Sequence, residues 1–543
     1  ANCGKGSPCT NLPASSPDWD KNGDGVPDTF TSASDADQIK NALSNAISSI
    51  LSKSSSGATV ATLSARSGIS SLILQPYYYP KVPDTDVSWI GFLRAFWVDL
   101  TGNLREDSIV NKILDLASGS FDKIIQFFVD TTGNTKITRI ENINTCTASD
   151  TVSIDEVSSV FNSGCWLANV EAGDRTIKYN KSGTLTDLTT SESSYLAGIW
   201  DDIDSTINTA KAECIIRYLK GEDLSGVTSC NTLAYVKRPR ELNINAYCGS
   251  NETKTWKLGD IIHSTPSVTS DKPLNFYHLR YGDTSYLSYI TTTNYKGRPS
   301  ISYVGANDGM LHAFRIGTII NQTNANQPSK LQNSPTDTGT DEIGKEEWAF
   351  IPKNAIPYLI WYGHYDYCHI PTIDYRTIVF DASINGTANS TKTESSWRTI
   401  LVGVMGFGGK KIDLGSGNVY SSSIFVLDLT DWLNGSATYP TLLWETTLPD
   451  NTLTTSFPTI VRLGDKNNNG DWYVVIGTGP IGPEGATFAN AGKLYFYDLR
   501  TGSLVNTLTV NTGSALVAIG DIYNVDVDDD YQDDVIYFGT YGK

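Results

Sequence analysis

Oxygen-bearing side chains recur at alternate positions in a short segment near the C-terminus. They belong to Asp526, Asp528, Asp530, Gln532 and Asp534. A hard cation such as Ca²⁺ takes roughly six to eight oxygen ligands. A loop can wrap around it with side chains at its first, third, fifth and ninth positions and a backbone carbonyl at its seventh, the place of Gln532 here. Without a cation, four clustered carboxylates would repel one another and raise one another's pKa. The spacing therefore predicts a calcium site, with a solvated acidic turn as the alternative.

A second segment, near the N-terminus, has the same register. Its members are Asp20, Asn22, Asp24, Val26 and Asp28. Val26 would contribute its backbone carbonyl, and Gly25 holds the sixth position, where the chain must bend sharply. Tyr531 takes that position in the C-terminal segment. Neither segment has the glutamate that an EF-hand carries at its twelfth position, so the remaining ligands would come from water or from elsewhere in the protein. We expect Ca²⁺ in both loops.

The composition is acidic but contains few charged residues. With 543 residues the chain is long enough for about two to four domains, each able to bury a core. Lysine and arginine number 41 and aspartate and glutamate 59, so the net charge is −18. This balance argues against nucleic-acid binding, which needs clustered basic side chains. Only 18% of residues are charged, whereas Ser, Thr, Asn and Gly are abundant and tyrosine numbers 28. Such a composition favours a β-rich exported surface protein over a cytosolic enzyme.

The eight cysteines form an even set without a C-x-x-C or C-x-x-C-H motif. Their spacing excludes a haem attachment site and shows no zinc signature. We interpret the close pairs as local disulfides and assign the remaining two cysteines to a longer bridge: Cys3/Cys9, Cys146/Cys165, Cys214/Cys230 and Cys248/Cys368. Free buried thiols are the alternative, and the disulfide interpretation depends on export from the cell. Eight cysteines allow about 105 pairings, so the connectivity itself is a guess.

No apolar stretch approaches the roughly 20 residues that cross a bilayer. The chain opens at Ala1-Asn2-Cys3 without Met or a signal peptide, and it stops at Gly542-Lys543 directly after a predicted strand. We interpret both ends as cuts in a longer protein.

The first half of the chain is expected to mix helices and strands. The clearest helix covers residues 34–53, where Ser34 is the expected N-cap and the apolar residues form one stripe. Further helices are predicted at 154–162 and 193–219, the latter ending near Lys220-Gly221, and residues 222–256 are expected to form a loop. Strands are predicted at Ala58–Ser64, Ser71–Tyr79, Trp89–Val98, Lys123–Asp130 and Thr135–Ile140.

From about residue 258 the chain becomes a run of short strands divided by Gly, Pro, Asn and Asp. Strand pairs recur at Tyr303–Asn307 with Met310–Ile316, Thr399–Met405 with Ser422–Asp428, Trp472–Thr478 with Lys493–Asp498, and Ser514–Ile519 with Val535–Gly539. Degenerate repeats of four-stranded units with glycine turns are typical of β-propeller blades. A β-sandwich is the alternative, because the interval between repeats varies.

Several short sequence motifs occur in the order found in a known family. They are Lys257-Leu-Gly-Asp-Ile-Ile-His-Ser-Thr-Pro266, Tyr303-Val-Gly-Ala-Asn-Asp-Gly-Met-Leu-His-Ala-Phe314, Glu347-Trp-Ala-Phe-Ile-Pro352, Trp397-Arg-Thr-Ile-Leu-Val-Gly403, Phe425-Val-Leu-Asp-Leu-Thr430 and Lys493-Leu-Tyr-Phe-Tyr-Asp498. Upstream stand Trp89-Ile-Gly-Phe-Leu-Arg94 and Asn103-Leu-Arg-Glu-Asp107. Through these motifs, which are spread over nearly its whole length, the chain resembles the PilY/PilC-type proteins of type IV pili.

The resemblance implies an extracellular, cell-surface protein at or near the pilus tip. Members of this family prime pilus assembly with minor pilins and mediate adhesion to host or abiotic surfaces. They also hold a cation loop that is linked to pilus extension and retraction. The family's calcium loop sits in a propeller blade, and Asp526, Asp528, Asp530 and Asp534 occupy that context here, with Gln532 giving its carbonyl.

Two departures from the family pattern affect the prediction. The von Willebrand factor A domain expected before residue 1 is missing, with no Asp-x-Ser-x-Ser motif in the chain. The later blades, expected beyond Lys543, are also absent, so we expect either missing sequence or a partner that covers the exposed edge. No Arg-Gly-Asp occurs, so an integrin-type contact is not transferred.

The predicted fold class is therefore mainly β, a β-propeller that is incomplete in this chain and is preceded by a smaller α+β region. We place a junction segment with a calcium-type loop at 1–33. The α+β region with hairpins and helices covers 34–257, and the propeller blades cover 258–543.

No motif in the chain predicts catalysis. The five histidines show no H-x-x-H or H-E-x-x-H spacing, and no Ser/His/Asp order stands out. His312 lies within a predicted strand, where a packed side chain is expected. Gly305-Ala-Asn-Asp-Gly309 lacks Gly-Lys-Ser/Thr and precedes a strand, so it predicts a hairpin turn rather than a phosphate loop.

Two further segments have ordinary structural interpretations. Asp465-Lys-Asn467-Asn-Asn469-Gly-Asp471 imitates the cation spacing but has Tyr473 at the ninth position, so we interpret it as a polar hairpin turn. The aromatic segment 358–367 is expected to pack between blades, with an exposed binding surface as the alternative.

Three functions compete at this stage. The first is a non-enzymatic, calcium-loaded pilus tip protein that binds minor pilins and a surface. The second is a structural subunit repeated along an extracellular filament. The third is a quinoprotein dehydrogenase, which shares an eight-bladed propeller and phrases such as Tyr497-Asp-Leu-Arg-Thr-Gly502. That enzyme commonly uses adjacent cysteines, and no Cys-Cys pair occurs here.

Overall fold

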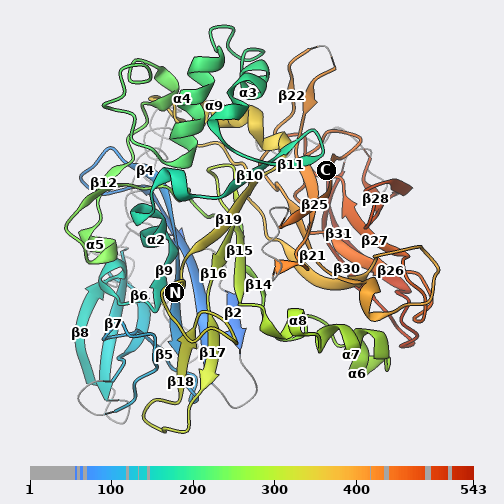
Figure 1. Ribbon diagram of the computed structural model, residues 1–543, viewed down its shortest axis with the longest axis horizontal. Helices are drawn as coiled ribbons and strands as arrows, with labels where there is room; N and C mark the ends of the chain where they lie inside the picture. Colours follow the sequence, from blue (N-terminus) through green and yellow to red (C-terminus); the bar gives the residue numbers. More distant parts are fainter. Residues whose placement is uncertain are drawn as a thin grey trace, which may run out of the picture.

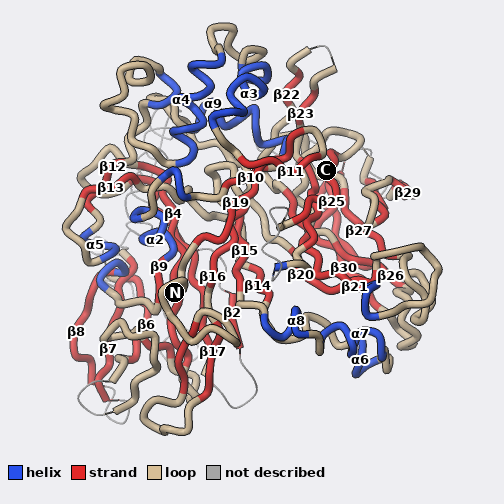
Figure 2. The backbone as a smooth tube through the Cα atoms, in the orientation of Figure 1, coloured by secondary structure: helices blue, strands red, loops and turns tan. Residues whose placement is uncertain are grey.

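Antiparallel sheets make up most of the molecule (Figure 1; Figure 2). The computed structural model describes residues 56–57, 61–64, 70–117, 121–131, 134–142, 147–415, 417–432, 439–482, 491–510 and 517–542. The predicted helix at 34–53 lies outside the described residues. A long sheet from the first part of the chain stands on one side, and the sheets formed after residue 376 stand on the other (Figure 1).

The long sheet has nine strands. Its order is β1 (Ser56–Gly57), β3 (Ser71–Lys81), β4 (Ser88–Val98), β5 (Leu104–Arg105), β6 (Ile124–Val129), β7 (Thr135–Asn142) and β8 (Thr147–Ser153), with β2 (Ala61–Ser64) paired to β3 and β9 (Phe161–Asn162) paired to β4. β3 and β4 pair over most of their length, from Ser71 opposite Val98 to Lys81 opposite Ser88. Consecutive residues of β4 are buried on both of its faces, because α2 (Ser163–Asn169) packs on this strand.

Three predictions for the connecting region are wrong. Residues 154–162 form a 3₁₀ turn (Ile154–Glu156) and strand β9, because the side chain of Asn162 accepts the backbone N–H groups of Gly164 and Cys165 and so starts α2 later. The predicted helix at 193–219 is two helices, α3 (Ser193–Trp200) and α4 (Thr209–Lys220), because the Asn208 side chain caps α4. Residues 222–256 contain elements that were not predicted: β12 (Glu241–Asn243), α5 (Asn245–Cys248) and β13 (Thr253–Thr255).

The first of the repeated sheets joins the two parts of the chain. Its order is β11 (Thr184–Asp187), β10 (Ile177–Lys181), β19 (Glu346–Ile351), β16 (Leu311–Arg315), β15 (Ile301–Gly305) and β14 (Ser267–Thr269). β10 pairs parallel with β19, with Ile177 opposite Ala349. This sheet therefore includes residues from both sides of the predicted division at residue 257.

The following sheets repeat a four-stranded antiparallel pattern. One contains β20 (Ile378–Ser383), β21 (Trp397–Val404), β24 (Ser423–Asp428) and β25 (Thr441–Thr447), and the next contains β26 (Thr459–Arg462), β27 (Trp472–Gly477), β28 (Lys493–Asp498) and β29 (Leu504–Thr509). β30 (Val517–Val525) and β31 (Val535–Gly542) form a two-stranded sheet, and small hairpins are made by β17 (Thr318–Asn321) with β18 (Ser329–Gln332) and by β22 (Ile412–Asp413) with β23 (Val419–Tyr420). The strand pairs predicted from the first three repeats are confirmed. The fourth hairpin also forms, but its first strand runs from Val517 to Val525, past the predicted end at Ile519, and residues 514–516 lie outside the described part of the chain. No closed ring of sheets forms among the described residues, as expected for an incomplete propeller.

Helices interrupt the repeated sheets at two points. α6 (Tyr277–Arg280), α7 (Thr284–Ile290) and α8 (Thr293–Gly297) form an insertion between β14 and β15, which reaches along the later blades (Figure 1). α9 (Leu359–Tyr362) continues a 3₁₀ helix at Lys353–Tyr358. The hydroxyl groups of Tyr286 and Tyr295 both donate to Asp381 on β20, each at 2.7 Å. Since Asp381 is fully buried, these bonds fix the helical insertion on its blade.

Two disulfides are present among the described residues. Cys214–Cys230 confirms the prediction, whereas Cys165 pairs with Cys248. The predicted pairs Cys146/Cys165 and Cys248/Cys368 are therefore wrong. The physical reason is that α2 and α5 bring Cys165 and Cys248 together across a sequence separation of 83, with their Cα atoms 5.6 Å apart. Cys368 is exposed and unpaired within the described part of the chain, and Cys3, Cys9 and Cys146 lie outside it.

A buried ionic network, which we call the ionic joint, links the first part of the chain to the first blade. It consists of Arg175, Glu346, His312 and Asp308. The Arg175 guanidinium donates to Glu346 at 2.9 Å, and Nδ1 of His312 lies 2.7 Å from the same carboxylate. Nε2 of His312 lies 3.1 Å from Asp308, which accepts the backbone N–H of Gly259. The prediction of a packed His312 is confirmed, since this side chain is fully buried.

Burial would by itself keep the carboxyl of Glu346 protonated and His312 neutral, but the ionic partners outweigh it. Burial raises the pKa of Glu346, yet Arg175 and His312 bring it down to about 2. Burial likewise lowers the pKa of His312, yet Asp308 and Glu346 raise it to about 9. The joint is therefore charged at neutral pH.

None of the described helices combines the length and the apolar character that a bilayer crossing requires.

Replacing Glu346 by Ala should lower the free energy of unfolding by about 3 kcal/mol or more, because Arg175 and protonated His312 would lose their shared partner while buried. The matched control is Glu347→Ala on the same strand, where the partly exposed ion pair with Arg315 contributes about 1 kcal/mol or less. Urea denaturation followed by tryptophan fluorescence measures both variants. Equal losses in the two variants would show that the joint does not hold the first blade.

Candidate metal centre

The predicted C-terminal calcium loop connects β30 to β31. Val525 pairs with Val535 at the base of this hairpin, and the backbone N–H of Asp534 donates to the carbonyl of Val525 at 2.9 Å. The ends of the loop are thus closed by the strand ladder. Its intervening residues are free to turn their side chains inward, as a cation loop requires.

Three of the predicted ligands come together. One carboxylate oxygen from each of Asp526, Asp528 and Asp534 lies within 4.8 Å of the others. Asp526 is buried, and the other two are exposed. Oδ2 of Asp526 accepts the Tyr281 hydroxyl at 2.7 Å and the backbone N–H of Tyr531 at 3.1 Å, whereas its Oδ1 is buried without a hydrogen-bond partner among the described residues. An unpaired buried carboxylate oxygen is costly, so this atom requires a further ligand.

Arginines from distant elements hold two other carboxylates of the loop. Arg280, at the end of α6, pairs with Asp529 and also donates to the backbone carbonyl of Asp526 at 3.3 Å. Arg462, at the end of β26, donates to Asp533 with its backbone N–H at 2.7 Å and with its guanidinium at 3.0 Å. These arginines neutralise Asp529 and Asp533. The carboxylates of Asp526, Asp528 and Asp534 are not paired with these arginines. Asp534 accepts the backbone N–H of Val527 at 2.8 Å, and Asp528 accepts that of Asp530 at 3.3 Å.

The loop is anchored by Tyr531, which is 2% exposed. Its ring contacts those of Tyr281, Tyr277 and Trp472, with centroids 5.3, 5.9 and 6.3 Å apart. Its backbone has φ of 91°, a left-handed conformation that is unfavourable for a bulky side chain. Burial of the aromatic ring offsets that cost. This is the sixth position of the loop, where a cation loop ordinarily has glycine, so the required bend is present without a glycine.

The protonation state of Asp526 suits cation binding. Burial raises the pKa of Asp526, but the hydrogen bonds from the Tyr281 hydroxyl and the backbone N–H of Tyr531 outweigh burial, and the pKa lies below the ordinary value for an aspartate. The carboxyl group is therefore ionised at neutral pH. Hard oxygen donors of this kind match Ca²⁺ or Mg²⁺ rather than a soft metal.

The remaining predicted ligands are placed differently or lie outside the described residues. Asp530 is not part of the group of three, because its carboxylate accepts the backbone N–H of Gln532 at 2.8 Å and the side-chain amide of Gln532 at 3.2 Å. A ligand role for Asp530 and for the Gln532 carbonyl stays a prediction. The whole N-terminal loop lies outside the described residues: Asp20, Asn22, Asp24, Val26 and Asp28.

Sequence reasoning did not identify Tyr281, Arg280 or Arg462 as part of this site. Arg280 is separated from Asp529 by 249 positions, and Arg462 from Asp533 by 71. No local spacing reports such contacts. The sequence analysis predicted only strands after residue 258, so the short helix α6, which ends at Arg280 and is followed by Tyr281, was not foreseen.

The structure also tests the interpretations of residues 465–471 and 358–367. Residues 465–471 form the turn between β26 and β27, in which buried Asn469 donates to the backbone carbonyl of Asn385, so the hairpin prediction is confirmed. In the aromatic segment 358–367, Tyr358 and Tyr362 are buried as predicted, whereas Tyr365 is 65% exposed.

Comparison with known proteins relates the chain to pilus factors. The model of the PilY1 beta-propeller domain matches residues 258–542. A type IV pilus biogenesis factor PilY1 homolog of Xylella fastidiosa is 29% identical over 345 residues, which cover 62% of this chain and 21% of that protein. The type IV pilus biogenesis factor PilY1 of Pseudomonas aeruginosa strain UCBPP-PA14 is 29% identical over 273 residues, 47% of this chain and 17% of that protein. The chain thus spans about a fifth of the length of these curated relatives. Among solved structures, the Pseudomonas aeruginosa PilY1 C-terminal domain matches with 23% identity and a TM-score of 0.33, over 50% of this chain and 43% of that chain.

Replacing Tyr531 by Ala should lower the free energy of unfolding by about 3 kcal/mol or more, because a buried ring is removed from an aromatic cluster. Tyr531→Phe keeps the ring and should cost about 1 kcal/mol, since the hydrogen bonds of its hydroxyl with Lys392 and Ser383 are lost. The control is Tyr537→Ala on β31, whose side chain is 60% exposed. Urea denaturation in the presence of EDTA measures all three. A loss for Tyr531→Ala no larger than that for Tyr537→Ala would contradict the anchoring role.

Proposed function

Because this chain belongs to the PilY1 family through its β-propeller domain, we propose that it is a calcium-binding component of type IV pili. In this proposal it acts in pilus assembly, in the control of extension and retraction, and in adhesion to a surface. Its place is extracellular, on the cell surface at the pilus tip, and its partners are minor pilins and a host or abiotic surface. Relatives named type IV pilus biogenesis factors support the pilus role.

Two observations carry the calcium proposal: Asp526, Asp528 and Asp534 each bring a carboxylate oxygen within 4.8 Å of the others, and one buried oxygen of Asp526 has no hydrogen-bond partner among the described residues. The remaining ligands would be the Asp530 side chain after release from Gln532, the Gln532 carbonyl, and water. A bound Ca²⁺ supplies positive charge that compensates the repulsion among these carboxylates. Mg²⁺ shares the donor type but demands near-octahedral geometry, which a flexible acidic hairpin suits less well.

The proposed consequence of cation binding is mechanical. Tyr281 and Arg280 bind the loop from the helical insertion, and Arg462 binds it from the neighbouring blade. A rigid loop would therefore hold β30–β31 against β26 and against α6. In this way cation occupancy would set the stiffness of the blades that a pilus partner contacts.

The role we propose is non-enzymatic. Three histidines of the described structure lie against carboxylates. His312 belongs to the ionic joint, Nδ1 of His263 lies 2.7 Å from Asp374, and Nε2 of His369 lies 2.7 Å from Asp260. The chemistry around the acidic loop is that of a structural cation site, with carboxylates, tyrosines and arginines that hold one another in place.

The double substitution Asp526→Ala with Asp534→Ala should abolish the rise in melting temperature that Ca²⁺ produces in the parent protein. At a calcium concentration of a hundred times Kd, a single site would stabilise the folded state by about 2.7 kcal/mol. Thermal melts with Ca²⁺ and with EGTA measure the effect, and Asp465→Ala, in the exposed turn before β27, is the matched control.

If the double variant retains the same calcium-dependent rise as the parent, the 526–534 loop is not the site. Elemental analysis of protein purified without chelator adds the stoichiometry. One calcium lost on the double substitution identifies this loop, and a second calcium that remains identifies the predicted N-terminal loop.

Single-particle labelling of the protein on intact pili should find label at one end of each filament, as expected for a tip component. A label spaced regularly along the filament would contradict the tip location and favour a repeating subunit. The parent and the Asp526→Ala, Asp534→Ala double variant are compared in the same assay. The position of the label tests the tip proposal, and the extension and retraction of the pili test the calcium proposal.

A further inference from the structure

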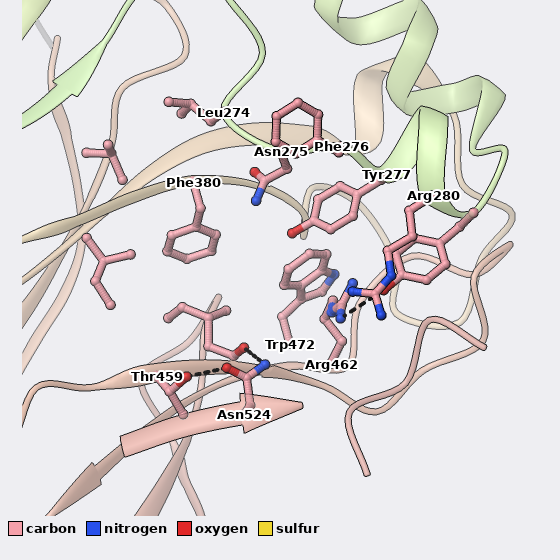
Figure 3. A pocket seen from close by; sticks show the side chains of 14 residues that line it. Leu274, Asn275, Phe276, Tyr277, Arg280, Phe380, Thr459, Arg462, Trp472 and Asn524 are labelled. Carbon is pink, nitrogen blue, oxygen red and sulfur yellow. Dashed lines mark hydrogen bonds between the residues drawn. The ribbon is translucent and has the colours of Figure 1, made fainter. Parts of the chain in front are cut away.

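A cavity of about 450 Å³ lies between α6 and the blades (Figure 3). Its lining includes Arg280, Tyr281 and Arg462, which also hold the 526–534 loop, but none of the carboxylates of that loop. One wall comes from the helical insertion and carries Phe276, Tyr277 and Arg280. The facing walls come from blade strands and include Phe380 on β20 and Trp472 on β27. The volume falls in the range of sites that bury a small molecule or a large side chain, roughly 300–1,000 Å³.

Aromatic rings dominate the cavity. Tyr277 and Trp472 meet edge to face with ring centroids 5.9 Å apart, and Phe380 lies beside Trp472 at 6.4 Å. Phe276 stands at the mouth and is 67% exposed. Such walls offer both faces and edges to another aromatic ring, an arrangement that stabilises offset-stacked and edge-to-face pairs.

Two polar groups point into the open space among these rings. They are the hydroxyl of Tyr277 and the side-chain amide of Asn275 (Figure 3). The Asn275 carbonyl oxygen accepts the backbone N–H of Asp381 at 2.8 Å, so the amide is held in one orientation with its NH₂ group as a donor. Burial raises the pKa of Tyr277, so its hydroxyl stays neutral at physiological pH. The cavity thus offers uncharged hydrogen-bonding groups at fixed places.

The charged groups at the cavity are already neutralised. Arg462 is paired with Asp533, and Arg280 is paired with Asp529. Exposed carboxylates of the 526–534 loop stand beside them, and the whole chain has a net charge of −18. An anionic ligand would face this acidic surface without a free cationic partner. An uncharged ligand avoids that repulsion.

The helical insertion that forms one wall of the cavity also carries exposed apolar side chains. Leu279 of α6 is 73% exposed and Leu287 of α7 is 46% exposed, in addition to Phe276. A free small molecule would be accommodated by the cavity alone. A polypeptide segment can place one side chain in the cavity and cover this adjoining surface with its neighbours, as hot-spot anchors do at protein interfaces.

We propose that this cavity receives an uncharged aromatic side chain from an extended segment of a partner protein. The ring would lie against exposed Phe276, with the Tyr277–Trp472 pair forming the wall behind it, and a peptide amide or a ring polar atom beside it would bond the Tyr277 hydroxyl and the Asn275 amide. The site does not depend on the calcium proposal, because neither the aromatic walls nor these two polar groups are ligands of the metal centre.

The test uses N-acetyl-tryptophanamide as a probe and the full chain, by isothermal titration calorimetry in Ca²⁺ and again in EGTA. The probe should saturate the parent, and N-acetyl-leucinamide should bind at least about threefold more weakly, because it lacks the ring. Phe276→Ala should weaken the probe about threefold to tenfold. Leu279→Ala is the matched control, equally exposed but not lining the cavity, and should leave the probe's affinity unchanged.

A cavity-filling variant provides an independent test. Ile378, at the start of β20, lines the cavity and is partly exposed, so Ile378→Trp should fill the space and abolish probe binding. A melting temperature close to that of the parent shows that this variant is folded. If the probe fails to saturate the parent, or binds Phe276→Ala and Ile378→Trp as it binds the parent, the proposal is overturned.

Two further ligands decide the class of occupant. Acetyl-Gly-Gly-Trp-Gly-Gly-amide should bind more tightly than the single-residue amide and should lose that gain in Leu279→Ala, because its flanking residues reach the adjoining apolar surface. Equal affinity of the two would assign the cavity to a free small molecule and contradict a partner segment. N-acetyl-tryptophan, with its free carboxylate, should bind more weakly than the amide, and tighter binding would contradict the charge argument.

Discussion

The candidate site depends on which carboxylates of the 526–534 loop are paired with arginines and which are not. Six of the nine residues of this loop are aspartates, and without compensation the carboxylates would push the hairpin open. Arg280 and Arg462 pair with Asp529 and Asp533, Asp530 accepts hydrogen bonds from Gln532, and Asp526, Asp528 and Asp534 come together. The same contacts make the loop a junction, because the two arginines belong to the helical insertion and to the neighbouring blade.

This pairing requires the helical insertion that supplies Arg280 to be held in a fixed place. Asp381, buried in β20, accepts hydrogen bonds from the hydroxyl groups of Tyr286 and Tyr295. Tyr531 packs its ring against Tyr277 of α6 and against Tyr281, the residue that follows this helix. Buried carboxylates and phenols of this kind stabilise only when each is paired. The insertion is therefore located by polar contacts on one side and by aromatic packing on the other. The cavity lined by Phe276 and Trp472 is the space left between these two sets of contacts.

The ionic joint has a corresponding role at the other end of the repeated sheets. Arg175, from the first part of the chain, shares Glu346 with His312, and β10 adds a parallel strand to the same sheet. Charges buried in this way contribute less to stability than an apolar core would, but removing one partner is expensive. The first part of the chain is thus built into the first blade, and the PilY1-type propeller region does not stand apart from what precedes it.

Local pattern was enough to predict the strands of the blades, the hairpin between Asp465 and Asp471, the Cys214–Cys230 disulfide, and the alternating carboxylates of the C-terminal loop. Each of these depends on residues close together in sequence, whose spacing reflects strand period, turn chemistry or short loop closure. Local pattern failed where a cap divided a helical run, at Asn162 and Asn208, and where Cys165 met Cys248 across 83 positions. The sequence alone thus determined that this chain forms repeated antiparallel sheets and carries an acidic hairpin in the cation register. Only the tertiary structure decided which of those carboxylates remain available, because the arginines and the tyrosine that sort them come from elements up to 249 positions away, and no spacing rule connects residues that meet only when the blades pack.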